Sequence, residues 1–247
     1  MKIRGLQKTS LIDYPAKIST VIFSSGCNLR CGFCHNSELV NNTEDKRGIS
    51  EKDIFTFLSS RKGLVDAVVL SGGEPLFQKD VIEFISLLKK SDLLVKIDTN
   101  GFFPDKLKMA LDLGIDYVAL DIKTSPSKYP VITGVNADFE KVHESFNLIK
   151  SSAVDYELRM TCVDGFCSDE DLSEIEKTLG RVKRFYLQQF VSESALDPVF
   201  RDIIPLPFSR LLEIKKKISE FSDDTVIRGI SEEIPAIREM ASLSVNI

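Results

Sequence analysis

Three cysteines and one histidine lie close together near the start of the chain. Residues 24–36 read SSGCNLRCGFCHN and contain Cys27, Cys31 and Cys34, with His35 directly after the last of them. Thiolates and imidazoles bind metals, and paired thiols form disulfides, so this spacing predicts either a cross-link or a metal centre. The alternatives are a disulfide, a zinc site, a covalent haem attachment and an iron–sulfur cluster.

Three of these alternatives leave residues unexplained. A disulfide leaves one thiol over, and structural zinc needs four ligands, whereas His35 is too close to Cys34 to serve easily as the fourth. The pattern Cys31-x-x-Cys34-His35 matches c-type haem attachment, but that chemistry ignores Cys27 and normally needs export. An iron–sulfur cluster uses all three thiolates, and with only three ligands it keeps one iron open to a small molecule.

Further polar residues follow three later apolar runs. SGGEP at 71–75 offers two glycines, which let a ligand approach the backbone closely, and the carboxylate of Glu74, which can accept from an ammonium group. The alternative is that this segment is a plain glycine turn into a helix. DTNG at 98–101 leads towards a helix start and is therefore a strand-to-helix turn rather than a hairpin. LDIK at 120–123 carries an Asp and a Lys, which also suit a solvated pair.

Periodicity adds a candidate in YELRMTCV, at 156–163. Its polar and apolar residues alternate, so Arg159 is expected to point into a barrel and Cys162 towards the helices as a buried thiol. A salt bridge to a neighbouring carboxylate is the other use for Arg159. Gln188 and Gln189 border the same region, and periodicity does not decide which faces inward. Cys167 falls in a turn.

Apolar β-type runs alternate with amphipathic segments along the whole chain. Strands are expected at Ile18–Ser24, Val65–Ser71, Leu93–Thr99, Asp116–Ile122, Tyr156–Val163 and Arg184–Phe190, with a short further strand at Val226–Ile230. Helical periodicity lies between them, as in Lys79–Lys90, and Ser50, Pro104 and Ser168 mark helix starts. This alternation predicts parallel β/α units. A closed barrel needs eight units, so the expected fold class is α/β: an incomplete (β/α)6 TIM-type barrel of parallel strands.

Composition restricts the class of protein. The 247 residues are 43% hydrophobic and 28% charged, which is typical of a globular protein, and they are expected to form one domain over 1–247, with a core at about 9–190 and a C-terminal extension at about 191–247. No signal peptide or membrane-spanning run is recognised, so the expected location is cytoplasmic. A net charge of −5 without a basic patch argues against nucleic-acid binding.

The motifs together resemble those of a known superfamily. The CxxxCxxC spacing with Phe33 before the last Cys resembles the signature of the radical S-adenosylmethionine (SAM) superfamily, and Gly72-Gly73-Glu74 resembles its GGE motif. TSLIDYPAKIST, CNLRCGFCHN and SGGEPLF are similar to segments of glycyl-radical-enzyme activases, typified by pyruvate formate-lyase activase. They are most similar to the activating proteins of anaerobic ribonucleoside-triphosphate reductase. The resemblance runs from about Thr9 to Phe190.

The resemblance implies a mechanism. One electron from a donor such as flavodoxin or ferredoxin enters a [4Fe-4S] cluster and passes to SAM, which is chelated by the open iron. The carbon–sulfur bond breaks, and the resulting 5′-deoxyadenosyl radical takes a hydrogen from a glycine of a partner enzyme. The expected partner is anaerobic ribonucleotide reductase, and another glycyl-radical enzyme is the alternative.

The resemblance also implies roles for individual residues. Glu74 would hold the amino group of SAM, and Lys123 would meet its carboxylate. The remaining SAM contacts would come from Phe33, His35, Gly72, Gly73, Asp98, Asp121, Ile122, Arg159 and Gln189. A monovalent cation at Asp98, Thr99 and Asp121 is a further implication. Asp13 resembles a position near the incoming protein loop, although a turn cap is an equally good use for it. Phe190 stands where many activases carry a His, which leaves adenine recognition open.

Two rival functions share some of these features. A radical SAM enzyme acting on a small molecule, such as a deazapurine synthase, would carry the same motifs but needs polar groups that close the barrel around its substrate. An iron–sulfur module without catalysis would have no use for Gly72-Gly73-Glu74 or Lys123. An open, six-stranded barrel favours a protein substrate.

Overall fold

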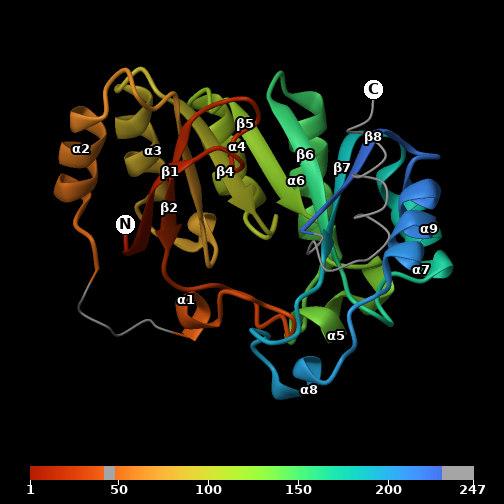
Figure 1. Cartoon of the computed structure of the whole chain (residues 1–247). Helices are drawn as coiled ribbons and strands as arrows, with labels where there is room; N and C mark the ends of the chain where they lie inside the picture. Colours follow the sequence, from red (N-terminus) through yellow and green to blue (C-terminus); the bar gives the residue numbers. More distant parts are fainter. Residues whose placement is uncertain (42–47, 230–247) are drawn as a thin grey trace, which may run out of the picture.

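The architecture comes from a computed structural model, in which residues 1–41 and 48–229 are described. One eight-stranded sheet curves around a central space, and the helices cover its outer face (Figure 1). Among these residues, no helix is both long and apolar enough to cross a membrane.

The strands follow one another in the sheet in chain order. They are β1 (Ile3–Ser10), β2 (Ser19–Ser24), β3 (Ala67–Gly72), β4 (Leu94–Thr99), β5 (Tyr117–Asp121), β6 (Asp155–Cys162), β7 (Val182–Gln189) and β8 (Ser222–Arg228). β1 is antiparallel to β2, and each later strand is parallel to its predecessor. In the described part of the chain β8 does not pair with β1, so the barrel is incomplete, as predicted.

Short helices and two 3-10 turns lie between the strands along the chain. They are α1 (Ser37–Asn41), α2 (Glu51–Ser60), α3 (Val81–Lys89), α4 (Pro104–Asp112), α5 (Tyr129–Thr133), α6 (Phe139–Ser151), α7 (Asp169–Leu179), α8 (Pro198–Arg201) and α9 (Phe208–Ile218), with 3-10 turns η1 (Pro75–Phe77) and η2 (Pro126–Lys128). The predicted starts are confirmed: the side chain of Ser50 caps α2, Pro104 opens α4, and Ser168 forms a capping box with Asp171 at α7.

All six predicted strands are present, and two features of the sheet differ from the prediction. The short strand expected at Val226–Ile230 is β8, which begins earlier and makes a seventh parallel strand; residue 230 lies outside the described residues. β1 was not predicted, because IRGLQKTS has few apolar residues and sits at an edge, where Gln7, Lys8 and Thr9 stay exposed. The division into core and C-terminal extension stays a prediction.

The core lies between the sheet and the helices. Val118 and Leu120 of β5 are fully buried and pack with Leu107, Phe146 and other apolar helix residues in one large cluster. The opposite faces of the strands line the barrel interior, and there polar residues dominate towards the carboxyl ends. The strand ends therefore deliver polar side chains into one interior space.

Candidate active site

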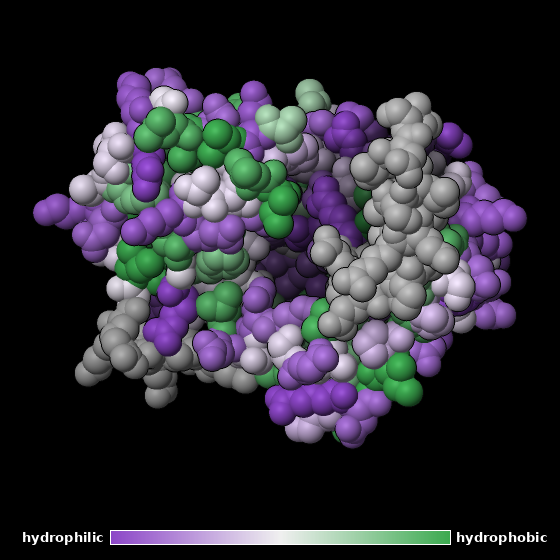
Figure 2. Space-filling model, viewed as in Figure 1, coloured by the Kyte–Doolittle hydropathy of each residue, from purple (hydrophilic) through white to green (hydrophobic). Residues whose placement is uncertain are grey.

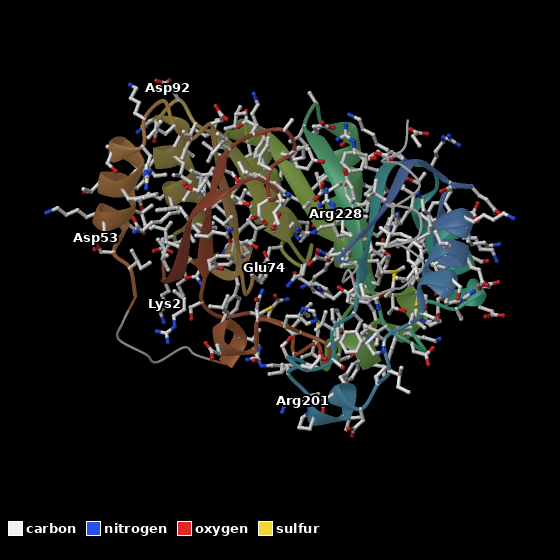
Figure 3. The ribbon with its side chains drawn as sticks, in the orientation of Figure 1. Lys2, Asp53, Glu74, Asp92, Arg201 and Arg228 are labelled. Atoms are coloured by element: carbon white, nitrogen blue, oxygen red, sulfur yellow. The ribbon has the colours of Figure 1, made fainter. Side chains whose placement is uncertain are left out.

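A cavity of about 350 Å³ lies at the carboxyl ends of the parallel strands. The predicted site residues that line it are Cys27, Cys31, Phe33, Cys34, His35, Gly72, Gly73, Glu74, Asp98, Thr99, Asp121, Lys123 and Arg159. Figure 2 shows this face of the molecule hollowed at its centre, with hydrophilic residues inside the hollow. Figure 3 shows Glu74 and Arg228 in the middle of the barrel, whereas Asp53, Asp92 and Arg201 lie at its periphery.

The three motif thiols are free and line this cavity together. Burial raises the pKa of Cys27 to about 12, where the Glu74 charge also contributes, and burial raises that of Cys31 to about 11, against the lowering effect of Lys123. Without a cation these thiols would stay protonated, and a bound metal is what stabilises buried thiolates. The backbone N–H of Leu29 donates to Cys27 Sγ at 3.4 Å, and Asn100 Nδ2 lies 3.7 Å from the same sulfur.

The position of the three thiols suits a cluster. Cys27, Cys31 and Cys34 line one cavity together, and each thiolate of a cubane binds a different iron. Structural zinc needs four protein ligands. The residues present therefore fit a three-thiolate cluster that keeps one iron open.

Phe190 lies beneath the cluster loop, which is the segment at 26–36 that carries the three motif thiols. It is 1% exposed and packs with Leu29, Cys31 and Phe33, and its ring lies 6.2 Å from that of His35. A histidine at this position would be buried in apolar surroundings at a cost. The Phe therefore supports the loop, and it does not line the cavity.

The glycines of the SGGEP turn allow two chain segments to touch. A Cβ on Gly73 would lie 2.1 Å from the carbonyl oxygen of Gly26, and one on Gly72, whose φ is +116°, would lie 2.4 Å from the backbone nitrogen of Ser24. The predicted reason, close approach of a ligand, is thus incomplete. Both glycines also hold the turn against the start of the cluster loop.

This contact predicts a stability effect. Gly73→Ala should lower the free energy of unfolding by about 1–3 kcal/mol, because the methyl group meets backbone rather than a movable side chain. Gly5→Ala is the matched control, since the atoms nearest to its Cβ would be those of the Phe23 side chain, at 3.3 Å or more. Thermal unfolding measures both variants. Equal melting temperatures would mean that the two segments separate at no cost.

Glu74 is the most enclosed carboxylate of the cavity, at 1% exposed. Its oxygens accept hydrogen bonds from the backbone of Leu76 (3.0 Å) and Asn100 (2.7 Å) and from Thr99 Oγ1 (2.9 Å). Burial nevertheless raises its pKa to about 7. A carboxylate has about four acceptor positions, so one remains for a donor in the cavity.

Arg159 bridges two aspartates from neighbouring strand ends. Its guanidinium lies 3.1 Å from Asp98 Oδ2 and 3.0 Å from Asp121 Oδ1, and Lys123 Nζ lies 3.4 Å from Asp121 Oδ2. Burial alone would raise the pKa of Asp98, but Arg159 and Lys96 lower it below its ordinary value. Asp98 Oδ1 is buried and accepts no hydrogen bond from the described residues. The predicted salt bridge and the predicted inward direction of Arg159 are both correct.

A second charged group lies deeper in the barrel and was not predicted. Lys96 is 2% exposed, and its Nζ lies 3.3 Å from Glu157 Oε1, while Tyr117 donates to Glu157 Oε2 at 3.0 Å. Arg228 Nη1 lies 3.7 Å from Glu157 as well. Buried charges need such partners. This cluster forms the floor of the polar interior.

Two predicted SAM contacts do not line the cavity. Gln188, which pairs in register with Thr161, lines it. Gln189 lines a neighbouring pocket that shares His35, Thr161 and Gln188 with the cavity, and its Nε2 donates to the carbonyl of Leu206 at 3.3 Å. A contact between Gln189 and SAM therefore stays a prediction. The side chain of Ile122 is fully buried in the apolar core.

The other two cysteines stay outside the cavity. Cys162 is fully buried in the core under the helices, as predicted, and Cys167 follows in the turn after β6 but is only 4% exposed. The Cys167 thiol donates to the carbonyl of Val163 at 3.2 Å. Neither thiol is positioned to be a ligand in the cavity.

The fold and the cavity agree with the comparison to known families. Residues 21–179 match the family described as the radical SAM superfamily, and the chain therefore belongs to it. A protein of Methanocaldococcus jannaschii named "Putative glycyl-radical enzyme activating enzyme" is 37% identical over 236 residues, which cover 93% of this chain and 96% of that protein. At this identity and coverage the chain belongs to the same family within the superfamily.

More distant relatives agree with this placement. The pyruvate formate-lyase-activating enzyme of Clostridium pasteurianum is 27% identical over 236 residues, covering 89% of this chain and 97% of that enzyme. A crystal structure of Streptococcus suis SuiB bound to precursor peptide SuiA superposes with a TM-score of 0.68 at 16% identity. It covers 89% of this chain but 50% of SuiB, and at that identity it supports the fold alone.

Proposed function

We propose that this chain generates a glycyl radical on a partner enzyme by reductive cleavage of SAM. The observation that carries the proposal is that three motif thiols share one cavity with Glu74 and Lys123, which follow the carboxyl ends of β3 and β5. The similarity to an activating enzyme over almost the whole chain supports the type of substrate.

Cys27, Cys31 and Cys34 would hold a [4Fe-4S] cluster with one open iron. When bound, the cluster supplies the electron that splits SAM into methionine and the 5′-deoxyadenosyl radical, and the protein supplies position and exclusion of water. Glu74 would accept a hydrogen bond from the SAM amino group, whose charge keeps the carboxylate ionised despite its raised pKa. Lys123 would meet the SAM carboxylate. Burial opposes its charge, but Asp121 and other nearby groups raise its pKa, so it stays positive.

The size of the cavity favours a protein substrate over a second small molecule. Its volume of about 350 Å³ lies at the lower end of the range for ligand sites, and the cluster and SAM would both have to fit in it, which leaves little room for a further small molecule. A second reactant then has to approach from outside, through the side that the sheet leaves open. This argues against the rival enzyme type that encloses a small substrate.

Three finer assignments belong to the proposal. The partner is anaerobic ribonucleotide reductase, on the resemblance of the motifs, and the electron donor is a flavodoxin or ferredoxin in the cytoplasm. The monovalent cation at Asp98, Thr99 and Asp121 stays a prediction. Arg159 already lies between the two carboxylates, so a cation there would have to share them.

The test is a radical measurement with the partner present. Anaerobically reconstituted and reduced protein is mixed with SAM and the anaerobic ribonucleotide reductase of the same source, and the electron paramagnetic resonance spectrum is recorded. We expect a doublet from a glycyl radical, which collapses when deuterium replaces the α-hydrogen. Formation of 5′-deoxyadenosine without a radical on this or any other glycyl-radical enzyme of the source would contradict the proposal and favour the small-molecule rival.

A further inference from the structure

The cluster loop is held between the cavity and two short helices, α5 and α8. Cys31 and Phe33 line the cavity, and they also pack in one apolar cluster with Ile132 of α5, against which Phe200 of α8 lies. Figure 1 shows α5 and α8 next to one another below the sheet. The loop can therefore be approached from the side of these helices as well as through the cavity.

Backbone contacts fix both helices against the loop. The N–H of Arg30 donates to the carbonyl of Thr133 at 2.8 Å, and the N–H of Asp197 donates to the carbonyl of Gly32 at 3.0 Å. A Cβ on Gly32 would lie 2.2 Å from the Phe200 ring, so this ring rests directly on the loop backbone. A partner bound to the outer side of α5 and α8 is separated from the loop by little more than these side chains.

The outer side of the two helices exposes large apolar side chains. Val131 of α5 and Val199 of α8 are each 68% exposed, and Ile204, which follows α8, is 82% exposed. We refer to these three residues as the α5/α8 patch. None of them lines the cavity. Exposed apolar side chains gathered beside a functional site indicate an interaction surface.

Two guanidinium groups lie on the same segments as the α5/α8 patch. Exposed Arg30 donates to the carbonyls of Cys27 (2.8 Å) and Leu29 (2.7 Å), and exposed Arg201, labelled in Figure 3, donates to the carbonyl of Ala195 at 2.9 Å. Among residues 1–41 and 48–229, neither guanidinium forms an ion pair with a carboxylate. Their charges are available to an acidic partner.

Three carboxylates lie in the segment that contains α8. Asp197 is used as the cap of α8, where it accepts from the N–H of Val199 at 3.0 Å. Glu193 is near enough to His35 to oppose the burial that lowers the His35 pKa. Asp202, at the end of α8, would have to stay outside a contact with an acidic partner.

We propose that the α5/α8 patch is the docking surface for the protein that reduces the cluster, an acidic one-electron carrier. This rests on the proposed function, which needs such a donor. In the step the carrier loses one electron and the cluster gains it, and no bond forms or breaks. A carrier seated on α5 and α8 leaves the open side of the barrel free, which favours the carrier over the substrate protein as the occupant. A few apolar side chains flanked by charges suit the small, short-lived contacts of electron transfer.

The test is the double substitution Val131→Glu/Val199→Glu, which removes apolar surface and adds two charges that repel an acidic carrier. The probes are the reduced flavodoxin and ferredoxin of the same source, and the electron paramagnetic resonance signal of the reduced cluster is followed against carrier concentration. We expect the half-saturating concentration to rise at least about tenfold. The dissociation constant of the oxidised carrier, measured by titration calorimetry, should rise by the same factor.

Reduction by dithionite separates docking from damage to the cluster. Dithionite needs no docking surface, so dithionite-driven 5′-deoxyadenosine formation should be unchanged in the double Glu variant. Leu87→Glu/Met109→Glu is the matched control, because it adds the same charge at side chains that are 37% and 50% exposed on α3 and α4, away from α8 (Figure 1). It should leave the half-saturating carrier concentration unchanged.

Several results would overturn the docking proposal. They are an unchanged half-saturating carrier concentration in the double Glu variant, an equal rise in the control variant, slower cleavage with dithionite as well, and failure of both carriers to reduce the unmodified protein. A dimer of this chain that the double Glu variant dissociates, or a rise only in the half-saturating concentration of the substrate enzyme, assigns the patch to another occupant and also overturns it. Absence of a glycyl radical on every candidate enzyme overturns the proposed function instead, while reduction by the carrier still decides docking.

Discussion

Replacing any one of Cys27, Cys31 or Cys34 by Ala is expected to abolish SAM cleavage. The three thiols line one cavity, and burial makes each of them a poor thiolate unless a metal is bound. Loss of a residue that only supports a metal ligand typically lowers metal affinity or activity ten- to a hundredfold. Loss of a ligand itself should therefore lower the rate of SAM cleavage more than about a hundredfold. Iron content after anaerobic reconstitution and 5′-deoxyadenosine formation measure the two consequences.

Cys162→Ala and Cys167→Ala are the matched controls. Both thiols are as buried as Cys31, yet neither lines the cavity, so both variants should bind iron and cleave SAM at nearly the normal rate. Loss of iron from the Cys162 variant as large as that from the Cys27 variant would contradict the assignment of the ligands.

The strands that were simplest to predict are those buried on both faces. β3 and β5 lie between the interior and the helices, so they appear as continuous apolar runs in the sequence. β1 lies at an edge and has no such pattern, and the two exposed aspartates near the start of β8 hid its first half. Periodicity reports burial, and edge strands are only partly buried.

The site was predictable where one topological rule applies. Parallel strands bring their carboxyl ends to one face, and this placed the cluster loop, Glu74, Asp98 and Lys123 together before any contact was known. Alternation along β6 gave the direction of Arg159 in the same way.

Contacts across the barrel could not be predicted in this way. Lys96 and Glu157 meet from β4 and β6, which are separated in the sheet by β5, so local spacing carries no sign of their pairing. Adjacent Gln188 and Gln189 are chemically identical, and only the register between β6 and β7 decides which of them faces the cavity. These features depend on the curvature and register of the whole sheet.

Removing the charge at Lys123 is expected to weaken SAM binding by roughly ten- to a hundredfold. Lys123→Met keeps the aliphatic stem and removes an ammonium group whose side chain is only 11% exposed and lies 5.7 Å from the centre of the Phe33 ring. Hydrogen bonds to charged groups contribute about 1.5–3 kcal/mol, which gives this range of affinity. Anaerobic titration calorimetry on reconstituted protein measures the dissociation constant, and the iron content should be unchanged.

Glu74→Ala should weaken SAM binding by a similar factor, because it removes the acceptor that faces the SAM amino group. It also leaves the N–H groups of Leu76 and Asn100 without their acceptor, so its thermal stability has to be measured alongside.

Lys106→Met separates these two effects. Lys106 Nζ donates to the carbonyls of Leu76 and Gln78, next to the same turn, but its side chain does not line the cavity. If the affinity loss arises from charges that contact SAM, Lys106→Met should lower stability and leave the dissociation constant unchanged. If the Lys123, Glu74 and Lys106 variants all keep the dissociation constant of the unmodified protein, the methionine moiety of SAM lies away from Glu74 and Lys123. Asp98, whose buried Oδ1 lies 3.5 Å from Lys96 Nζ, would then be the next polar group to test in the same cavity.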